Sequence, residues 1–389
     1  MKRQPRIRTL MAVGTAILGF TGLAIAQAGP ASADPTQVYV TVGSDTTQDV
    51  MNQYALDLAG NELGSFNAVN PVNQTPHEII TPVNKAAGNC SFTRPNGSGE
   101  GLAALRKSIN QATTAAQLAA PPQANCIDFS RSSSGPGTNQ SNTGDLVYIP
   151  FALDAVAGSV GPTGTTAITQ ANLFTLADLV NLYKNCVNVT EGGVTYNPNT
   201  AGAGQTQINL YIPQSGSGTR NFWATTLGFS NTTLPPCVHD TIVAGPNATH
   251  IVEEHDGTAV STDPNGFGPF SIAQWISQRN GHNDRRHGAL LTNIGGTSPF
   301  SNGNPNTGSL NTAFPITREV YNIVKFSKVS GAGADPALVG LLVGAGSALC
   351  QDQFTIIGYG FALLGAGTTD QCGSIANTLR AFDPATNPV

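Results

Sequence analysis

The chain has 389 residues, of which 44 are glycine, 25 are proline and only 11% are charged. Hydrophobic residues make up 40% of the sequence, which is enough for a sizeable core and excludes a coiled coil or an intrinsically disordered chain. Glycine and proline together indicate a loop-rich globular protein. After residue 33, no apolar run approaches the ~20 residues that span a bilayer, so we expect no integral membrane segment in the exported part.

Residues 1–33 have the pattern of an export signal. Four basic residues and no acidic residue lie within residues 1–8. An apolar stretch follows from Thr9 to about Ala26. Ala31-Ser32-Ala33 then provides a small-x-small cleavage site, which predicts a mature start at Asp34, with weaker sites after Ala26 and Ala28. The signal has no Arg-Arg pair, so we expect export by the general secretory route. No cysteine lies near the cleavage sites, so we expect no lipid anchor there. An uncleaved membrane anchor is the alternative.

Removal of this signal makes the chain more acidic. The whole sequence has 18 basic and 23 acidic residues, and the signal holds four of the bases, which leaves a net charge of −9. This charge argues against nucleic acid as a partner. It does not exclude a small anion, because such a ligand responds to local dipoles more than to net charge.

Six cysteines in an exported chain predict three disulfides. Fifteen pairings are possible, and we favour the three that close local loops. No CxxC pair occurs, so neither a zinc site nor thiol redox chemistry is expected. The favoured pairs are Cys90–Cys126, Cys186–Cys237 and Cys350–Cys372.

Strand-like and helix-like patterns alternate along the exported part, which predicts an α/β fold with mainly parallel sheets. The 356 residues that follow the signal suit two lobes better than one. Polar stretches at 64–98, 190–206 and 296–312 are expected to be surface loops or insertions. The expected strands lie at 38–42, 146–151, 208–212 and 320–326, and the expected helices contain 50–58, 102–109 and 176–183.

Three glycine-rich turns each open a helix, at 40–47, 96–101 and 214–220. Each turn offers glycine for close approach of the backbone and Ser or Thr hydroxyls as donors. A helix N-terminus also presents unpaired N–H groups and the positive end of the helix dipole to an anion. One such turn is more often an ordinary helix cap. Three in one chain favour a tetrahedral or carboxylate anion held between lobes.

These turns resemble the motifs of the periplasmic phosphate-binding proteins, the soluble receptors of phosphate ABC transporters. Four segments carry most of the resemblance, and it extends over most of the exported chain. It implies two α/β lobes joined by a hinge, with a ligand cleft between them. Lobe I would comprise 34–152 and the return segment 313–389, and lobe II would comprise 153–312. The four segments are 43–47, 97–101, 127–133 and 215–220, with further matches at 174–179, 266–270 and 314–318.

The resemblance also implies a set of anion-binding residues, with two departures from the family pattern. Ser133 stands where the family has an aspartate that accepts the proton of hydrogen phosphate, and Pro213 stands where the family has an arginine. We therefore expect Arg220 to be the main cationic contact and Arg131 the second, and we expect sulfate to compete with phosphate. The implied set is Thr46, Thr47, Ser98, Arg131, Ser132, Ser133, Ser217, Gly218, Thr219 and Arg220.

Two other clusters suggest different chemistry. Glu253, Glu254, His255 and Asp256 could hold one carboxylate of a glycosidase pair, but a solvated turn is the favoured interpretation. The segment 282–287, with His282, Asp284 and His287, has residue types found in metal sites, but its arginines indicate an exposed basic loop. No GxSxG elbow occurs. We therefore expect no enzyme activity, no cofactor and no metal.

Together these patterns predict a secreted or periplasmic solute-binding protein for phosphate or a related oxyanion. The resemblance further implies a monomer that delivers its ligand to an ABC transporter permease. An extracellular binding or adhesion protein with a larger ligand is the alternative. A secreted phosphohydrolase on the same fold is a third possibility.

Overall fold

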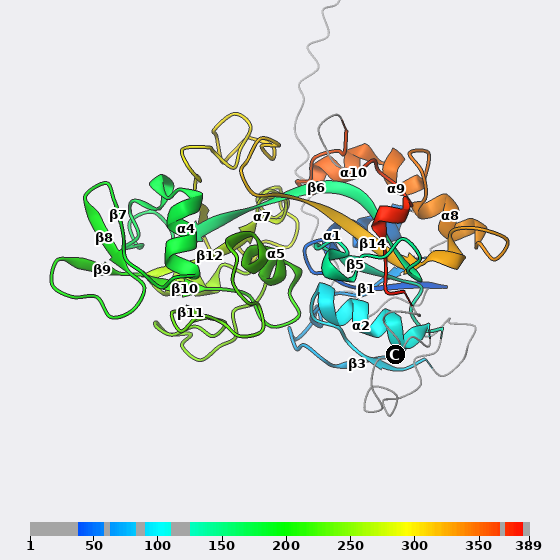
Figure 1. Cartoon of the computed structure of the whole chain (residues 1–389), viewed down its shortest axis with the longest axis horizontal. Coiled ribbons are helices and arrows are strands. Elements are labelled where there is room, and N and C mark those ends of the chain that lie inside the picture. The colour runs from blue at the N-terminus through cyan, green and yellow to red at the C-terminus, as the bar shows by residue number, and fades with distance from the viewer. Residues whose placement is uncertain (1–37, 58–62, 83–89, 110–124, 366–369, 384–389) are drawn as a thin grey trace, which may run out of the picture.

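The computed structural model describes residues 38–57, 63–82, 90–109, 125–365 and 370–383; the predicted signal lies outside them. Figure 1 shows two halves joined by two long strands, β6 (Leu146–Val160) and β14 (Thr317–Lys325). The first half contains the elements before β6 and those after β14. The second half contains the elements between the two strands. The predicted α/β fold with two lobes is thus confirmed in outline.

One sheet runs through both halves. Its strand order is β11-β10-β12-β6-β14-β5-β1-β2, and β13 and β15 also pair with β6. The pairs at both ends are parallel, but the central pairs that involve β6 and β14 are antiparallel. The prediction of mainly parallel sheets is therefore correct only at the ends, because the two connecting strands cross between the halves in opposite directions. The remaining strands of this sheet are β1 (Tyr39–Gly43), β2 (Leu63–Ser65), β5 (Phe129–Ser132), β10 (Asn209–Tyr211), β11 (Val238–His239), β12 (Gly266–Ser271), β13 (Leu290–Leu291) and β15 (Arg380–Ala381).

The helices begin where the sequence pattern places them. The N-cap of α4 is Thr175, which forms a capping box with Asp178, and α5 begins after Ser217 and ends at Gly228 in the left-handed region (φ 75°). The helices are α1 (Gln48–Asp57), α2 (Ser98–Ser108), α4 (Leu176–Tyr183), α5 (Gly218–Leu227), α6 (Thr258–Thr262), α7 (Ile272–Arg279), α8 (Pro336–Leu342), α9 (Ala348–Gln351) and α10 (Gln353–Gly358), with 3₁₀ turns at Gly137–Asn139, Ala171–Leu173, Phe326–Lys328 and Asn377–Leu379.

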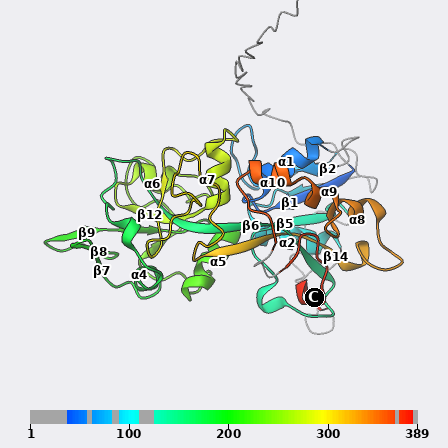
Figure 2. The same ribbon diagram turned by 90° about the horizontal axis from the view of Figure 1, so that it is seen from above.

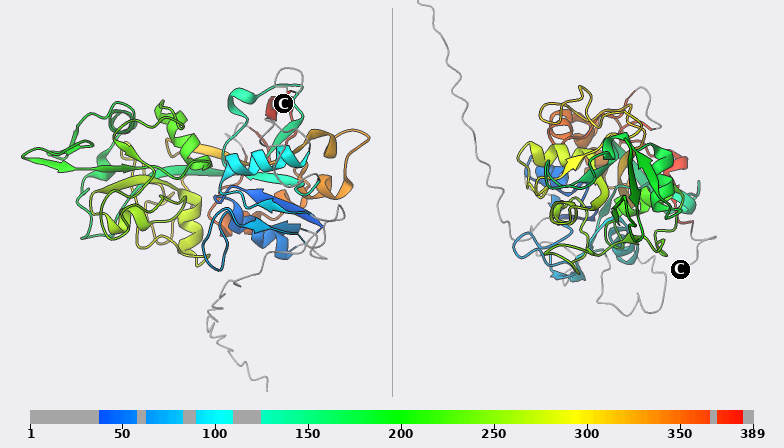
Figure 3. Two further views of the ribbon diagram at one scale, coloured as in Figure 1. Left: turned by 90° about the horizontal axis from the view of Figure 1, so that it is seen from below. Right: turned by 90° about the vertical axis from the view of Figure 1, so that its left-hand side faces the viewer.

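Two small sheets lie outside the main one. Strands β3 (Ile79–Ile80) and β4 (Phe92–Thr93) form a pair in the first half. Strands β7 (Val189–Glu191), β8 (Val194–Asn197) and β9 (Gln205–Gln207) form a three-stranded sheet that projects from the far end of the second half (Figures 2 and 3). The segment 190–206, which was predicted to be a surface loop or an insertion, is thus an insertion that contains strands of its own.

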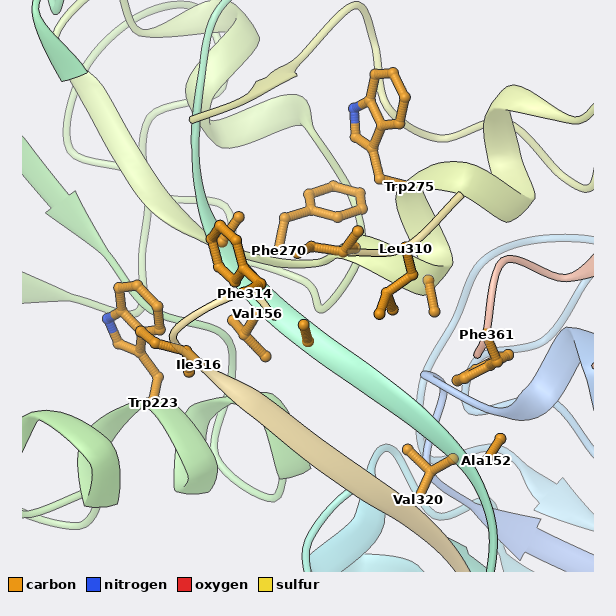
Figure 4. Packing of buried hydrophobic residues seen from close by; sticks show 14 of the residues in the cluster. Ala152, Val156, Trp223, Phe270, Trp275, Leu310, Phe314, Ile316, Val320 and Phe361 are labelled. Atoms are coloured by element: carbon orange, nitrogen blue, oxygen red, sulfur yellow. The ribbon is translucent and has the colours of Figure 1, made fainter. Parts of the chain in front are cut away.

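The largest hydrophobic core follows the two connecting strands from one half into the other. In Figure 4, Val156 lies on β6 and Ile316 lies just before β14, beside Phe314, while Val320 and Ala152 lie toward the first half. Trp223 and Trp275 belong to the same core and are buried.

All three predicted disulfides are present. Cys90 pairs with Cys126, Cys186 with Cys237 and Cys350 with Cys372, with Cα–Cα distances of 5.4, 5.8 and 5.8 Å. Each bridge closes a local loop, as the spacing predicted. Among the described residues, no helix is both long and apolar enough to cross a membrane.

Candidate anion-binding site

The three glycine-rich turns meet where the two halves touch. The amide of Gly99 donates to the carbonyl of Gly216 at 2.9 Å, and the Gln214 side chain donates to Asn96 at 3.1 Å. The approach is close enough to require glycine: a Cβ on Gly218 would lie 2.2 Å from Ser133 Oγ and 2.3 Å from Ser98 Oγ. The sequence-based expectation that these turns gather at one place is therefore correct.

A single carboxylate oxygen receives hydrogen bonds from both halves. Glu254 Oε1 accepts from the Thr46 hydroxyl at 2.9 Å in the first half. In the second half it accepts from the Thr219 hydroxyl at 2.5 Å and from the Thr219 amide at 3.2 Å, near the N-terminus of α5. All three side chains are buried. The predicted anion donors Thr46 and Thr219 thus already hold an anionic oxygen that belongs to the chain itself.

Arg318 is the cation at this cluster. Its Nη2 donates to Thr219 Oγ1 at 2.8 Å and lies 3.4 Å from Thr46 Oγ1, while Nε donates to Asp154 Oδ2 at 2.9 Å. Arg318 and Asp154 face each other in the register of β14 and β6, so both connecting strands contribute to the site. Arg318 is only 5% exposed, and its Nη1 has no hydrogen-bond partner within the described part of the chain.

Asp154 keeps Arg318 in place from the other side. Its Oδ1 accepts from the Ser271 hydroxyl at 2.8 Å and from the Ala273 amide at 3.1 Å, at the start of α7. The carboxylate therefore has partners for both oxygens, and the guanidinium has one fixed neighbour. This arrangement leaves the outer face of Arg318 directed at Thr46 and Thr219.

The remaining predicted residues differ in whether their hydroxyl groups already have hydrogen-bond partners within the protein. Ser98 and Ser133 lie side by side, with 3.2 Å between their hydroxyl oxygens, and the Ser133 amide donates to Ser98 Oγ. Thr47 is fully buried, and its hydroxyl has no partner among the described residues. Ser132 instead bonds locally to Ser134, and Ser217 accepts from the Arg220 amide as the cap of α5. Ser132 and Ser217 thus have structural roles.

The two predicted cationic contacts are not directed at this cluster. Arg131 is buried and donates to Ser65 Oγ and to four backbone carbonyls, which occupies its guanidinium. Arg220 donates to the carbonyls of Pro213 and Asn231 and pairs with Asp240 at 2.8 Å. Both arginines brace loops of their own half. The expectation that Arg220 is the main contact has to be replaced, and Arg318 has the suitable position.

The segment 253–256 is not a solvated turn, which corrects the sequence-based interpretation. Glu254 and His255 are buried, and the His255 ring lies at the contact with Thr46 of the first half. Although burial acts to raise the pKa of Glu254, its neighbours His255, Arg318 and Thr219 lower that pKa below the usual range, so the carboxylate is ionised. Burial lowers the pKa of His255, although the neighbouring Glu254 carboxylate acts to raise it.

The segment 282–287 was predicted to be an exposed basic loop, and the structure agrees for Asp284 and His287. Asp284 and His287 are exposed and His282 is half-buried, and Asp284 pairs with Arg286 of the same loop at 2.6 Å. These residues do not form a shared ligand set with one another in the described part of the chain. The residues that sequence reasoning missed are Arg318, Asp154 and Glu254, which come from three distant segments. Arg318 ends the matched segment 314–318, which was the only available signal.

Neither a protein-family model nor a curated protein sequence matches the chain. Among solved structures, the chain is similar to an ABC-type phosphate transport receptor from Vibrio cholerae, with 14% identity, coverage of 84% of this chain and 100% of that one, and a TM-score of 0.48. It is also similar to a phosphate-binding protein from Stenotrophomonas maltophilia, with 14% identity, coverage of 90% and 98%, and a TM-score of 0.41. What this chain binds has to be inferred from its own side chains.

Proposed function

We propose that this chain is an exported binding protein that holds phosphate or a related oxyanion between its two halves. The observation that carries the proposal is that the Thr46 and Thr219 hydroxyls, one from each half, both donate to one buried anionic oxygen, while Arg318 donates to Thr219 Oγ1 beside it. Donors that satisfy a buried carboxylate oxygen also suit an oxygen of a bound oxyanion, because both demand charge-assisted hydrogen bonds.

The residues around this point can complete an oxyanion site. Arg318 Nη1 and the Thr47 hydroxyl are buried without partners, and Ser98 and Ser133 lie against the start of α5. A ligand that contacts Thr46 on one side and Thr219 on the other gains most when the halves are together. We therefore propose Thr46, Ser98, Ser133, Thr219 and Arg318 as the ligand contacts, with Glu254 moving or sharing donors when the ligand binds.

The same proposal includes the wider role. The halves correspond to lobe I (34–152 and 313–389) and lobe II (153–312), with bending at β6 and β14. The chain would act as an exported monomer that delivers its ligand to an ABC-type permease, without catalysis. Two features support export: the signal-like sequence of residues 1–33 and three complete disulfides.

Calorimetry with inorganic phosphate on the purified exported chain tests the proposal. Thr219→Val removes the hydroxyl donor with little change in volume and should weaken binding by about 10- to 150-fold, since a hydrogen bond to a charged group contributes about 1.5–3 kcal/mol. Thr225→Val is the matched control, because Thr225 is exposed on the same helix. No measurable phosphate binding in the wild type, or equal losses in both variants, would refute the proposal.

A further inference from the structure

Three side chains of metal-ligating type meet beside this cluster, and they come from both halves. Asp45 lies in the turn between β1 and α1, while Glu254 and His255 lie before α6. The three are 3%, 0% and 2% exposed. One potential ligand atom from each lies within 4.8 Å of the others.

The distances suit a shared ion. His255 Nε2 is 3.1 Å from Glu254 Oε1 and 3.3 Å from Asp45 Oδ1. Nitrogen and oxygen ligands lie about 2.0–2.2 Å from zinc, so two ligands of one tetrahedral ion are about 3.3–3.6 Å apart. Thr46 Oγ1 lies 2.9 Å from both Nε2 and Oε1 and is the nearest further oxygen.

The hydrogen bonds of the protein leave these groups incompletely satisfied. Asp45 Oδ1 and Glu254 Oε2 are buried atoms without a hydrogen-bond partner in the described part of the chain, and so is His255 Nδ1. Burying a carboxylate without a partner is costly, because the charge loses its hydration. Arg318 already pairs with Asp154 at 2.8 Å. Burial raises the pKa of Asp45, and the charge of Arg285 acts to lower it without an ion pair between these two described residues. Two neighbouring carboxylates without full compensation are a site for a cation.

We propose that Asp45, Glu254 and His255 bind one divalent metal ion of the zinc class, which links the two halves. One imidazole nitrogen and two carboxylate oxygens match the ligand types of zinc, whereas magnesium and calcium sites use oxygen alone. The ion would neutralise the two carboxylates and would give a ligand bond to Asp45 Oδ1, which has no hydrogen-bond partner among the described residues. This site would adjoin the proposed oxyanion contacts, because Glu254 Oε1 also accepts from Thr46 and Thr219.

Zinc titration of the full exported chain, treated with a chelator and kept free of phosphate, tests the site. Calorimetry should show one zinc ion per chain. His255→Ala and Asp45→Asn should each weaken binding by about 100-fold or more, because each loses a ligand bond. His287→Ala is the matched control, since His287 is an exposed imidazole near Asp256 of the same segment. Zinc should also raise the melting temperature of the wild type and of His287→Ala, but not of His255→Ala.

Several outcomes would overturn the site. Absence of a stoichiometric zinc ion in the wild type is one, and equal losses in His255→Ala and His287→Ala are another. If His255→Ala unfolds, Asp45→Asn with circular dichroism as a folding check decides between the outcomes. Because phosphate is absent from the titration, failure here leaves the oxyanion proposal standing, and a phosphate titration of the chelated chain tests that proposal separately.

Discussion

At the scale of single residues, the buried pair of Arg318 and Asp154 combines stability with the proposed function. Asp154 uses both oxygens within the protein, while Arg318 keeps one nitrogen without a partner in the described residues. Arg318→Gln should lower the free energy of unfolding by about 3–5 kcal/mol, because it leaves a buried carboxylate unpaired. Urea denaturation measures this loss.

The pair of Arg286 and Asp284, whose side chains are 19% and 48% exposed, provides the comparison for that prediction. Arg286→Gln should change the free energy of unfolding by only about 0–1 kcal/mol, since surface ion pairs contribute little. The double variant Arg318→Gln/Asp154→Asn should recover part of the loss, because it removes both charges. A small effect of Arg318→Gln alone would show that water or another group compensates Asp154.

The position of Glu254 changes the expected affinity of the site for sulfate relative to phosphate. The sequence pattern predicted competition by sulfate, since Ser133 replaces the acceptor carboxylate of the family. The structure instead places the ionised Glu254 carboxylate among the donors, with Oε2 unpartnered. An ionised carboxylate only accepts hydrogen bonds, so hydrogen phosphate, which carries a proton, suits it and sulfate does not.

We therefore expect sulfate to bind at least about tenfold more weakly than phosphate, since one unmatched acceptor contact costs about 1–3 kcal/mol. Glu254→Gln should reduce this difference, because the amide can also donate. Competition calorimetry with both anions measures the ratio. Equal affinities for the two anions in the wild type would count against this role of Glu254.

At the scale of elements, the sequence predicted what local chemistry determines. The helices α2, α4 and α5 follow their apolar spacing and glycine-rich or capped starts, and the three disulfides follow the local spacing of the cysteines. The sheet β7–β9 was missed because its strands are only three or four residues long, which is too short for a clear apolar alternation. The antiparallel centre of the main sheet depends on long-range pairing that no local pattern reports.

The disulfide Cys186–Cys237 joins the end of α4 to the start of β11 and closes a loop of 51 residues. All six cysteines should be oxidised in the exported protein, so alkylation under denaturing, non-reducing conditions should label none. The double variant Cys186→Ser/Cys237→Ser should lose about 2–5 kcal/mol of stability, mainly because the unfolded chain becomes less constrained. Thermal unfolding tests this, and labelling of two or more thiols in the wild type would contradict full oxidation.

At the scale of the whole molecule, the candidate site depends on contacts between segments far apart in the chain. The turns at 40–47, 96–101 and 214–220 were recognisable because glycine, hydroxyl groups and a helix start recur within a few residues. Arg318 and Thr219 are separated by 99 residues, and Asp154 meets Arg318 only through the register of β6 and β14. Glu254 was placed at the surface because four polar residues in a row suggest a turn, whereas the packing of the two halves buries it.

The contact between the halves should also respond to pH through His282. Its ring stacks on Tyr359 with 4.0 Å between ring centroids, so the loop after α7 in the second half meets the end of α10 in the first. Burial lowers the pKa of His282, although Asp49 on α1 acts to raise it. The neutral ring is therefore favoured when the halves touch, and protonation favours their separation.

Because the pKa in the contact lies below the usual value of about 6.5, the stabilisation is present at pH 7.5 and is lost as the pH falls below about 6.5. Small-angle scattering of the ligand-free chain should show a larger radius of gyration at pH 5 than at pH 7.5. His282→Phe keeps the stacking and cannot be protonated, so its radius should change less between the two conditions. An identical pH response in wild type and His282→Phe would assign the opening to other groups. Asp49, whose charge acts on the His282 ring, would be the first to examine.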